Sequence, residues 1–506
     1  MGSNKIENTL YYGDNLDILQ RYIPDESVDL VYLDPPFKSD QNYNVLFKEK
    51  NGSQAASQIR AFEDTWTWGQ DDEAVYGDLV LKGGKVADCL RAFRTFIGPC
   101  DMLAYLVMMA PRLVELHRVL KIMGSIYLHC DPTASHYLKM LMDAVFDARN
   151  FRRELVWRSG WVSGFKSAAK NWIRNHDVIL YYLRDEKQPR KFYIPFKPHP
   201  PGYKRRGGTG ENPKGVPYDD VWVDIYSPAI MSFSREKLGY PTQKPVALLE
   251  RIIGASSDEG DLVLDPFCGC GTTIEAAQKM KRRWIGIDIT HLAITLIKKR
   301  LLDAFGTDLQ FNVIGEPTSL PDAKALAESD PYQFQWWALG LVGARPVEQK
   351  KGADKGIDGK IVFQGDAPGI FENVIISVKA GNITANHVRD LRGVIDREKA
   401  AIGVLISMED TTKPMQTEAI TVGFFESKTW GKKYPKVQLL TIAELLAGKK
   451  IDMPPIKQVD ATFRKAGKFI EEDFKQLELT EKPLPAPKGE KAKKRRGGPA
   501  KAKPPR

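Results

Sequence analysis

The chain has 506 residues, 42% of them hydrophobic, which is enough for two or three domains with separate cores. Its five cysteines exclude a disulfide framework, and no run of about 18 apolar residues could form a membrane span. The net charge of +10 is consistent with an ordinary basic enzyme. It is also consistent with a protein that binds a polyanion. The first residues lack the apolar core of a signal peptide, so we expect a cytoplasmic protein that does not bind membranes.

Short apolar strands alternate with helical patterns from the N-terminus to about residue 185. We expect strands at TLYYGD (9–14), SVDLVYLD (27–34), GSIYLHCDP (124–132) and HDVILYYLR (176–184). Apolar residues recur at helical spacing over 101–120 and 134–146. Strands that alternate with helices form parallel sheets, so this part predicts an α/β fold.

The rest of the chain divides by composition. Residues 186–240 are rich in Pro, Gly, Lys, Arg and aromatics without a period, which indicates a binding insertion or a solvated loop. Strand and helix patterns return over 241–316, and 317–450 has the pattern of a separate, smaller α/β domain. The basic tail, 451–506, has almost nothing to bury, so we expect it to be largely disordered.

A glycine loop follows a buried strand at LVLDPFCGCGTT (262–273). Gly269 and Gly271 allow a ligand to approach backbone N–H groups, and Asp288 ends the next strand, where an acid can bind ribose hydroxyls. Asp265, just before the loop, would repel a phosphate but suits a ligand with positive groups, such as S-adenosylmethionine. Cys268 and Cys270 are too close for an ordinary zinc knuckle, so we expect no metal here.

A second motif, DPPF at 34–37, ends an earlier strand. Together, DPPF and DPFCGCGTT (265–273) resemble the motifs of amino-group DNA methyltransferases. The catalytic motif precedes the cofactor motif, so the chain is similar to the permuted β group. Other stretches appear in the family's order along residues 9–300: GDNLDIL (13–19), GSIYLHCDPTASHYLK (124–139) and GYPTQKPVALLERII (239–253).

This resemblance implies a seven-stranded, Rossmann-like methyltransferase domain over 1–316, with 186–240 at the target-recognition position. It implies transfer of a methyl group from S-adenosylmethionine to N6 of a flipped adenine in double-stranded DNA. The catalytic residues would be Asp34, Pro35, Pro36 and Phe37. The cofactor-binding residues would be Asp265, Phe267, Gly269, Gly271, Thr272 and Asp288, with Asp14 and Lys244. For Asp14 a turn residue, and for Lys244 a solvent-facing side chain, are the structural alternatives.

The chemistry of the DPPF motif is consistent with this implication. An exocyclic amino group is a weak nucleophile because its lone pair is delocalised into the ring. Asp34 and the Pro35 carbonyl can accept its hydrogen bonds, the rigid Pro-Pro holds them in place, and Phe37 can stack on the base. The same chemistry serves N4 of cytosine; within the family, Asp34 favours adenine. A catalytically inert DNA-binding protein is the alternative from another class.

The smaller domain carries Asp358 and, on a later strand, Ser377-Val378-Lys379. This pattern resembles the PD-(D/E)xK nuclease fold of the Mrr-like branch, in which two carboxylates hold Mg²⁺ beside a lysine. Ser377 stands where the motif has an acid, and the helical stretch DPYQFQWW offers Gln333 and Gln335 where an acid could help. Mg²⁺ at Asp358, cleavage activity, a nuclease-derived DNA-binding role and a homodimer are all left open.

Overall fold

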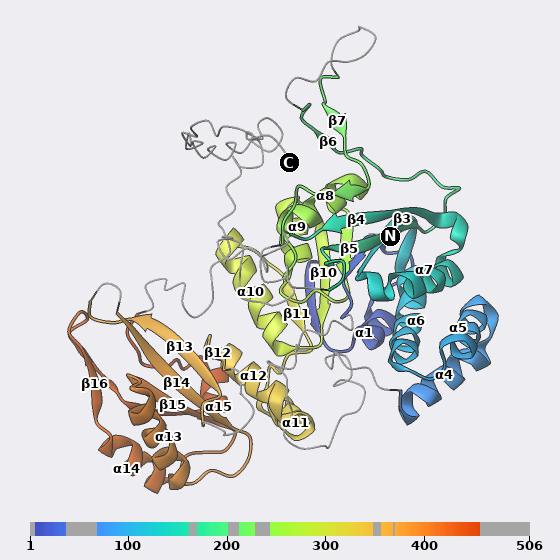
Figure 1. Ribbon diagram of the computed structural model, residues 1–506. Coiled ribbons are helices and arrows are strands. Elements are labelled where there is room, and N and C mark those ends of the chain that lie inside the picture. Colours follow the sequence, from blue (N-terminus) through green and yellow to red (C-terminus); the bar gives the residue numbers. More distant parts are fainter. Residues whose placement is uncertain are drawn as a thin grey trace, which may run out of the picture.

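The computed structural model describes residues 6–36, 68–160, 170–200, 212–227, 243–347, 356–367 and 370–455. Within these ranges the strands form one large sheet, one five-stranded sheet and two small two-stranded sheets (Figure 1). Phe37, the basic residues Lys204, Arg205 and Arg206, and the tail from residue 456 lie outside the described residues. No described helix is long and apolar enough to cross a bilayer.

The large sheet contains nine strands in the described part of the chain, where the sequence predicted seven. In spatial order they are β11 (Asn312–Ile314), β1 (Thr9–Tyr12), β10 (Arg283–Asp288), β9 (Leu262–Asp265), β2 (Val28–Leu33), β3 (Leu120–Cys130), β5 (His176–Leu183), β4 (Phe151–Arg158) and β8 (Val221–Trp222). The two additional strands, β11 and β8, are short and lie at the two edges. Short edge strands carry too little pattern to be predicted from sequence.

Strand direction explains where the ends of the strands lie. All neighbours from β11 to β3 are parallel, whereas β5 runs antiparallel to both β3 and β4. The prediction of a parallel sheet was therefore wrong for β5. This strand follows β4 in the chain and pairs with it directly, because antiparallel neighbours need no crossover helix between them. Strand β9 is the direct neighbour of β2, although the chain reaches it much later.

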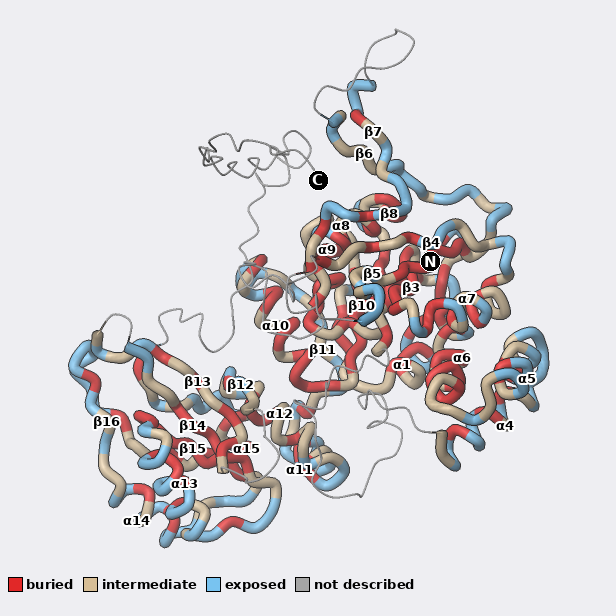
Figure 2. The backbone as a smooth tube through the Cα atoms, in the orientation of Figure 1, coloured by how far each residue is buried: buried red, intermediate tan, exposed pale blue. Residues whose placement is uncertain are grey.

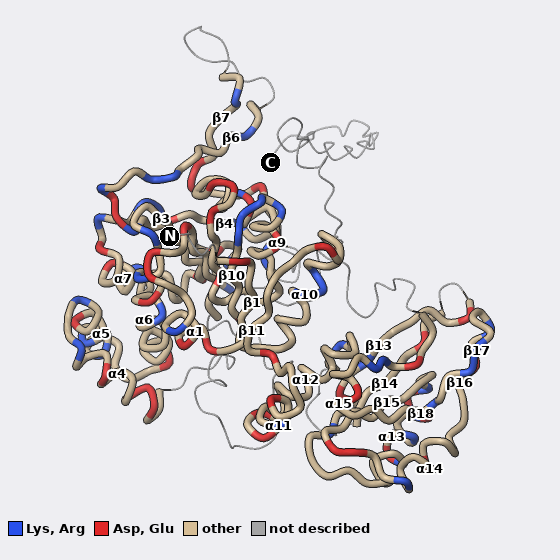
Figure 3. Tube along the Cα trace, turned by 180° about the vertical axis from the view of Figure 1, so that it is seen from behind, with Lys and Arg blue, Asp and Glu red and all other residues tan. Residues whose placement is uncertain are grey.

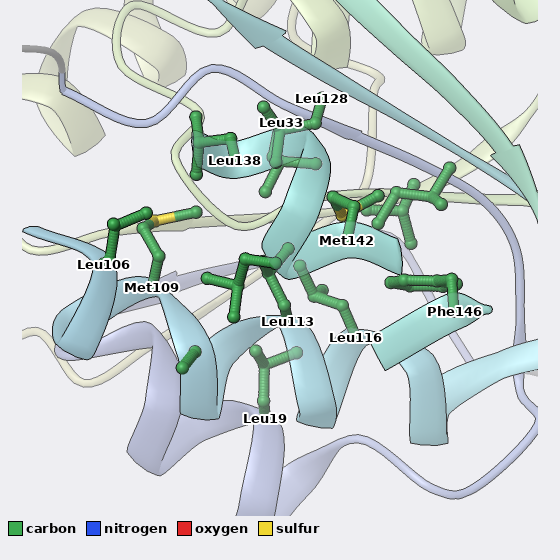
Figure 4. Close-up of a cluster of buried hydrophobic side chains, with 14 of the residues drawn as sticks. Leu19, Leu33, Leu106, Met109, Leu113, Leu116, Leu128, Leu138, Met142 and Phe146 are labelled. Atoms are coloured by element: carbon green, nitrogen blue, oxygen red, sulfur yellow. The ribbon is translucent and has the colours of Figure 1, made fainter. Parts of the chain in front are cut away.

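Helices cover both faces of this sheet, because side chains alternate along each strand. Val31 and Leu33 of β2 face a core shared with α1 (Asn15–Tyr22), α6 (Asp101–Val119) and α7 (Pro132–Phe146), shown in Figure 4. Leu30 and Tyr32 face the opposite core with α8 (Val246–Ser256), α9 (Thr272–Lys279) and α10 (His291–Phe305). Buried residues concentrate along the strands and the inner faces of these helices (Figure 2).

Outside this body lie two peripheral elements. Helices α4 (Gln70–Lys82) and α5 (Gly84–Ile97) pack against α6 and α7. The short hairpin of β6 (Phe196–Lys197) and β7 (Val216–Pro217) stands away from the large sheet, and Lys and Arg recur along the segment that leads to it (Figure 3). This hairpin belongs to the predicted insertion at 186–240.

The C-terminal part forms a second α/β unit around the five-stranded sheet (Figure 1). Its strands, in spatial order, are β12 (Arg345–Pro346), β13 (Gly359–Gln364), β14 (Phe371–Lys379), β15 (Ile402–Ser407) and β18 (Val437–Thr441). Its other elements are α11 (Leu320–Ser329), α12 (Pro331–Leu341), α13 (Ala385–Glu398), α14 (Lys413–Thr421), α15 (Ile442–Leu446) and the hairpin of β16 (Phe424–Ser427) and β17 (Lys432–Pro435). Clusters of apolar residues fill both faces of this sheet.

Candidate active site

Four acidic residues lie at the carboxyl ends of neighbouring parallel strands, along one edge of the large sheet. Asp14 follows β1, Asp34 follows β2, and Asp265 and Asp288 are the last residues of β9 and β10. Strands β1, β10, β9 and β2 are consecutive parallel neighbours, so their carboxyl ends meet at this edge. Open α/β sheets bind ligands at such an edge. The structure thus brings the two motifs together, while each residue's role toward a ligand stays a prediction.

The glycine loop between β9 and α9 has the backbone that its sequence predicts. Gly269 and Gly271 have φ of +50° and +77°, in the left-handed region that favours glycine. A Cβ at Gly271 would lie 2.7 Å from Cγ1 of Ile297, so α10 approaches the loop too closely for any side chain. The Gly271 N–H donates to the Cys268 carbonyl at 2.7 Å, so the loop closes tightly just before α9, which begins at Thr272.

The side chain of Thr272 points into the protein. Its hydroxyl donates to the Lys244 carbonyl at 3.2 Å and accepts from the buried Arg300 at 3.1 Å. Arg300 also donates to the Cys270 carbonyl at 3.1 Å and pairs with Glu275. Thr272 therefore fixes the segment that carries Lys244. Sequence reasoning missed Arg300, because a lone arginine on an amphipathic helix gives no signal of a buried partner.

Asp265 and Asp288 are both buried and both held by loop hydrogen bonds. Asp265 accepts from the Phe267 N–H at 3.0 Å, and Asp288 accepts from the Gly269 N–H at 2.9 Å and the Thr290 N–H at 2.9 Å. Burial raises the pKa of Asp265 to about 7, although hydrogen bonds from Thr273 and Phe267 act in the opposite direction. Burial likewise raises the pKa of Asp288 to about 6. A cation that enters this site would favour the ionised form of both carboxyls.

Binding of a cationic ligand should therefore release protons. In the empty protein both carboxyls have pKa values above the unfolded value, so between about pH 4 and 7 the folded chain holds protons that the unfolded chain has lost. The stability of the empty protein should fall as pH rises through this window, whereas affinity for a cation should rise. We expect release of about one proton on binding S-adenosylmethionine at pH 6 and almost none at pH 8. Calorimetry at each pH in two buffers of different ionisation enthalpy measures this; equal enthalpies at pH 6 would contradict it.

The two carboxylate oxygens of Asp34 have different surroundings. Oδ2 accepts from Nζ of Lys244, in an ion pair that is largely shielded from solvent. Oδ1 is buried and has no hydrogen-bond partner among the described residues. A buried carboxylate oxygen without a donor is costly, so this atom is suited to accept from a ligand N–H. Lys244 thus contacts the predicted catalytic acid, and its predicted place beside the cofactor stays a prediction.

A buried polar chain lies behind this ion pair. The Tyr32 hydroxyl is 2.8 Å from Nδ1 of His129, and Nε2 of His129 is 3.3 Å from Oδ2 of Asp177. Burial raises the pKa of Asp177, but the hydrogen bond with His129 and the charges of His129, Lys244 and Arg174 lower it further, so its carboxyl is ionised. Lys244 therefore experiences two carboxylates, Asp34 and Asp177. The strands that carry these residues were predicted, yet their spacing in sequence does not pair them.

Replacing Lys244 by methionine should slow catalysis more than it weakens cofactor binding. The ion pair fixes Oδ2 and leaves Oδ1 as the free acceptor, so its loss allows Asp34 to rotate. We expect kcat to fall by about 10- to 100-fold, because a small misplacement of a reacting group has this effect. Lys244→Arg should retain part of the rate. Lys82→Met, at an exposed helix end, is the control and should not lower kcat. A raised Kd for the cofactor with an unchanged kcat would contradict this expectation and support the predicted cofactor role alone.

Asp14 has a structural partner at the start of α1. It accepts from the Leu16 N–H at 2.7 Å as the helix cap and from Nη2 of Arg112 at 2.9 Å. Nε of Arg112 also donates to the side-chain oxygen Oδ1 of Asn15 at 2.6 Å, and Nδ2 of Asn15 donates to the Pro266 carbonyl at 2.8 Å. The turn role that was weighed for Asp14 is thus present. Through Asn15 it ties α1 to the glycine loop, and contact with a cofactor stays a prediction.

The second motif pair, Asp358 and Lys379, is also brought together. Oδ2 of Asp358 accepts from the Val378 N–H at 2.7 Å and from the Ser377 hydroxyl at 3.2 Å. Lys379, the last residue of β14, directly follows Val378. Ser377 thus hydrogen-bonds the first acid rather than adding a second. Gln333 accepts instead from the His291 N–H of α10, so it does not replace the missing acid. The described residues contain no cluster of three or more His, Cys, Asp or Glu fit for a metal.

An open, mostly parallel sheet, a glycine loop and acids at the ends of adjacent strands define an α/β fold of the class that binds ligands at its strand ends. Residues 28–299, more than half of the chain, match a family model described as DNA methylase, of the N6 and N4 class. The chain belongs to this DNA methylase family. Residues 332–447 match a second model, described as NACHT-associated inactive Restriction Endonuclease 1. Neither match tests the Mrr-like branch or the permutation.

Named proteins resemble the same part of the chain. It is 29% identical over 309 residues to the type II methyltransferase M.BamHI of Bacillus amyloliquefaciens, covering 58% of this chain and 56% of that protein. It is 29% identical over 308 residues to the DNA adenine methyltransferase YhdJ of Escherichia coli K12, covering 58% and 82%. The solved structure of PvuII DNA methyltransferase (cytosine-N4-specific) has 17% identity and a TM-score of 0.33, covering 58% and 86%. The chain thus spans little more than half the length of M.BamHI.

Proposed function

We propose that this protein transfers a methyl group from S-adenosylmethionine to an exocyclic amino group of a base in double-stranded DNA. The single observation that carries the proposal is Oδ1 of Asp34, a buried carboxylate oxygen without a partner among the described residues. It lies at the sheet edge that also carries the glycine loop and two buried acids. Membership of the DNA methylase family supports the same reaction.

The residues at this edge fit the cofactor. Asp265 and Asp288 are buried carboxyls that a sulfonium and an ammonium group would favour in the ionised form. Gly269 and Gly271 give the loop its left-handed backbone just before α9, and Phe267 belongs to the same loop. When bound, S-adenosylmethionine supplies the methyl group on a sulfonium centre. Asp288 would bind the ribose hydroxyls, and the loop would bind the amino-acid end.

Asp34 and the Pro35 carbonyl orient the target amine. Each accepts one N–H of the amino group, which favours a pyramidal nitrogen with its lone pair toward the methyl group. Lys244 holds Oδ2, so that Oδ1 is the atom that receives the amine. Pro36 stiffens the turn, and Phe37 stacks on the base, which must leave the duplex to reach this site. The segment at 186–240 would contact phosphates and the groove.

We infer adenine N6 as the target, with cytosine N4 as the second candidate. Both amino groups are conjugated in the same way, so the geometry at Asp34 serves either. Asp34 in the first position of the motif favours adenine, and the relative YhdJ is named as an adenine methyltransferase. A place in a type II restriction–modification system is suggested by the name of M.BamHI.

Mass spectrometry of nucleosides tests this function. DNA from cells that express the full chain is compared with DNA from cells that express Asp34→Ala. N6-methyladenine in the first sample alone supports the proposal, and N4-methylcytosine alone keeps the reaction and overturns the target. No methylated base in either sample, from folded protein that binds DNA, would favour the inert DNA-binding alternative.

The C-terminal unit is inferred to lack cleavage activity. Mg²⁺ prefers several oxygen ligands of carboxylate type, and the site offers Asp358 with a serine in place of the second acid. The matching family model is itself described as an inactive endonuclease. A homodimer and a cytoplasmic, nucleoid-associated location remain predictions.

A further inference from the structure

Helix α12 belongs to two packed regions at once. Phe334, Trp337 and Ala338 are buried in the apolar cluster of the C-terminal sheet. Gln333 and Gly340, on other positions of the same helix, contact α10 of the large sheet. Helix α10 begins three residues after Asp288, the predicted ribose acid. The C-terminal unit therefore contacts the element that follows the cofactor site directly.

The approach of the two helices is close. Oε1 of Gln333 accepts from the His291 N–H, the first residue of α10, at 3.1 Å. A Cβ on Gly340 would lie 2.6 Å from Oγ1 of Thr295, one turn further along α10. No side chain fits between the helices at that point without a shift. These two contacts, one turn apart on α10 and about two turns apart on α12, fix the position of α10 along α12.

The first turn of α10 in turn holds Asp288. Thr290 caps the helix, because its hydroxyl accepts from the Ala293 N–H at 3.2 Å. The same residue donates to Oδ1 of Asp288 twice, from its N–H at 2.9 Å and from its hydroxyl at 2.8 Å. Gln333 therefore holds His291, next to Thr290, and Thr290 orients the carboxylate.

The ring of His291 packs in the same place. It is fully buried and stacks on Tyr12, with 3.6 Å between ring centroids. Tyr12 pairs with Asp288 in the register of β1 and β10. Burial lowers the pKa of His291, so the ring is neutral at pH 7 and acts here by packing. The backbone N–H of His291 thus provides a polar link between the C-terminal unit and this turn.

We propose that the C-terminal unit braces the cofactor site of the methyltransferase, with Gln333 as a positioning residue for Asp288. The inference rests on the proposed function, because it assigns a role in binding S-adenosylmethionine. Gln333 satisfies one of the backbone N–H groups that every helix leaves free at its start, and this holds the first turn of α10 in place. The unit thus has a role that needs neither Mg²⁺ nor a second acid at position 377.

Variants of the full chain separate this role from general folding. Gln333→Met removes the acceptor at similar size, and Gln333→Glu keeps an acceptor oxygen at a helix start, where negative charge is favourable. Gly340→Leu inserts a side chain between the two helices. Gly393→Leu is its control, because Gly393 is an exposed helix glycine with open space around its Cα.

Calorimetric binding of S-adenosylmethionine is the main measurement. We expect Gln333→Met to bind about 3- to 10-fold more weakly, as the loss of a helix cap would do. Gly340→Leu should lose at least as much, whereas Gln333→Glu and Gly393→Leu should stay within about twofold of wild type. Amide hydrogen exchange over 286–296 should rise in the two weakened variants, and kcat at saturating cofactor should stay unchanged.

The outcomes distinguish this inference from the proposed function. If the wild type does not bind S-adenosylmethionine, the proposed function fails. If the wild type binds and Gln333→Met binds equally well with unchanged exchange over 286–296, the brace is overturned. Equal losses in Gly393→Leu and Gly340→Leu would also overturn it, because the effect would then be general. Gln333→Met remains decisive should Gly340→Leu fail to fold.

Discussion

We expect Asp34→Ala to lower kcat of the proposed methyl transfer by about 10²- to 10³-fold, the range for removal of one positioned hydrogen-bonding group at a reacting centre. The loss follows from the two oxygens of the carboxylate. Oδ1 is the buried, unpartnered acceptor, and Oδ2 is fixed by Lys244. Alanine leaves the amino group with the Pro35 carbonyl alone and removes one of the two carboxylates that act on Lys244. Single-turnover rates with saturating S-adenosylmethionine measure this step directly.

The same variant should bind the cofactor almost as well as the wild type, because the loop and Asp288 belong to other strands. Asp308→Ala, in an exposed turn after α10, controls for the loss of a carboxylate as such. Transfer by Asp34→Ala at a near wild-type rate would remove the catalytic role from Asp34. Loss of cofactor binding in parallel with rate would instead assign Asp34 to the cofactor site.

Gly271→Val should disable both the loop and the packing beneath it. A valine at φ of +77° is strained by about 1–3 kcal/mol, and its Cβ meets Ile297 at 2.7 Å, which adds about 1–3 kcal/mol of overpacking. Either the buried Ile297 side chain or the loop must shift, and a shift of the loop displaces the backbone at the start of α9. We expect the cofactor Kd to rise by at least about tenfold, since this cost exceeds about 1.4 kcal/mol.

Gly306→Val provides the matched control. Gly306 also has a positive φ, +85°, yet a Cβ there meets no atom within 4 Å. It therefore suffers the backbone strain without the clash and lies at the far end of α10. Denaturation with and without S-adenosylmethionine should show both variants destabilised, but only Gly271→Val deprived of stabilisation by the cofactor. Equal effects would mean that close packing at Gly271 is unimportant for binding.

The sequence predicted the strands and loop of the candidate site well, because their signals are local. Buried apolar runs, a glycine pair and an acid at a strand end each occupy a few neighbouring residues, and the structure places Asp34, Asp265, Asp288 and the loop at one edge. The antiparallel direction of β5 was missed, because apolar alternation reports a strand but not its direction. The edge strands β8 and β11 were too short to give a pattern.

The partners of the site residues could not be predicted, because each joins segments far apart in the chain. Lys244 reaches Asp34 across 210 residues, and Arg112 reaches Asp14 across 98. Side chains of the same type recur throughout the chain, so composition and spacing do not select one pair among many. The hydrogen bond between Gln333 and His291 also joins distant segments. Gln333 was considered for the nuclease motif, but the structure places it against α10.

The order of strands has a consequence for how the protein is made. Strands β1 and β2 are the first two in the chain, yet β10 and β9 lie between them in the finished sheet. At about 5–20 residues per second, the ribosome needs some tens of seconds between the synthesis of β2 and of β10. During that interval the strands that bring Asp14 and Asp34 to the same end of the sheet are missing. The apolar side chains of β1 and β2 are then not covered by β9 and β10. The nascent chain should thus depend on chaperones until residue 288 has emerged, and a fragment that ends earlier should have no cofactor site at all.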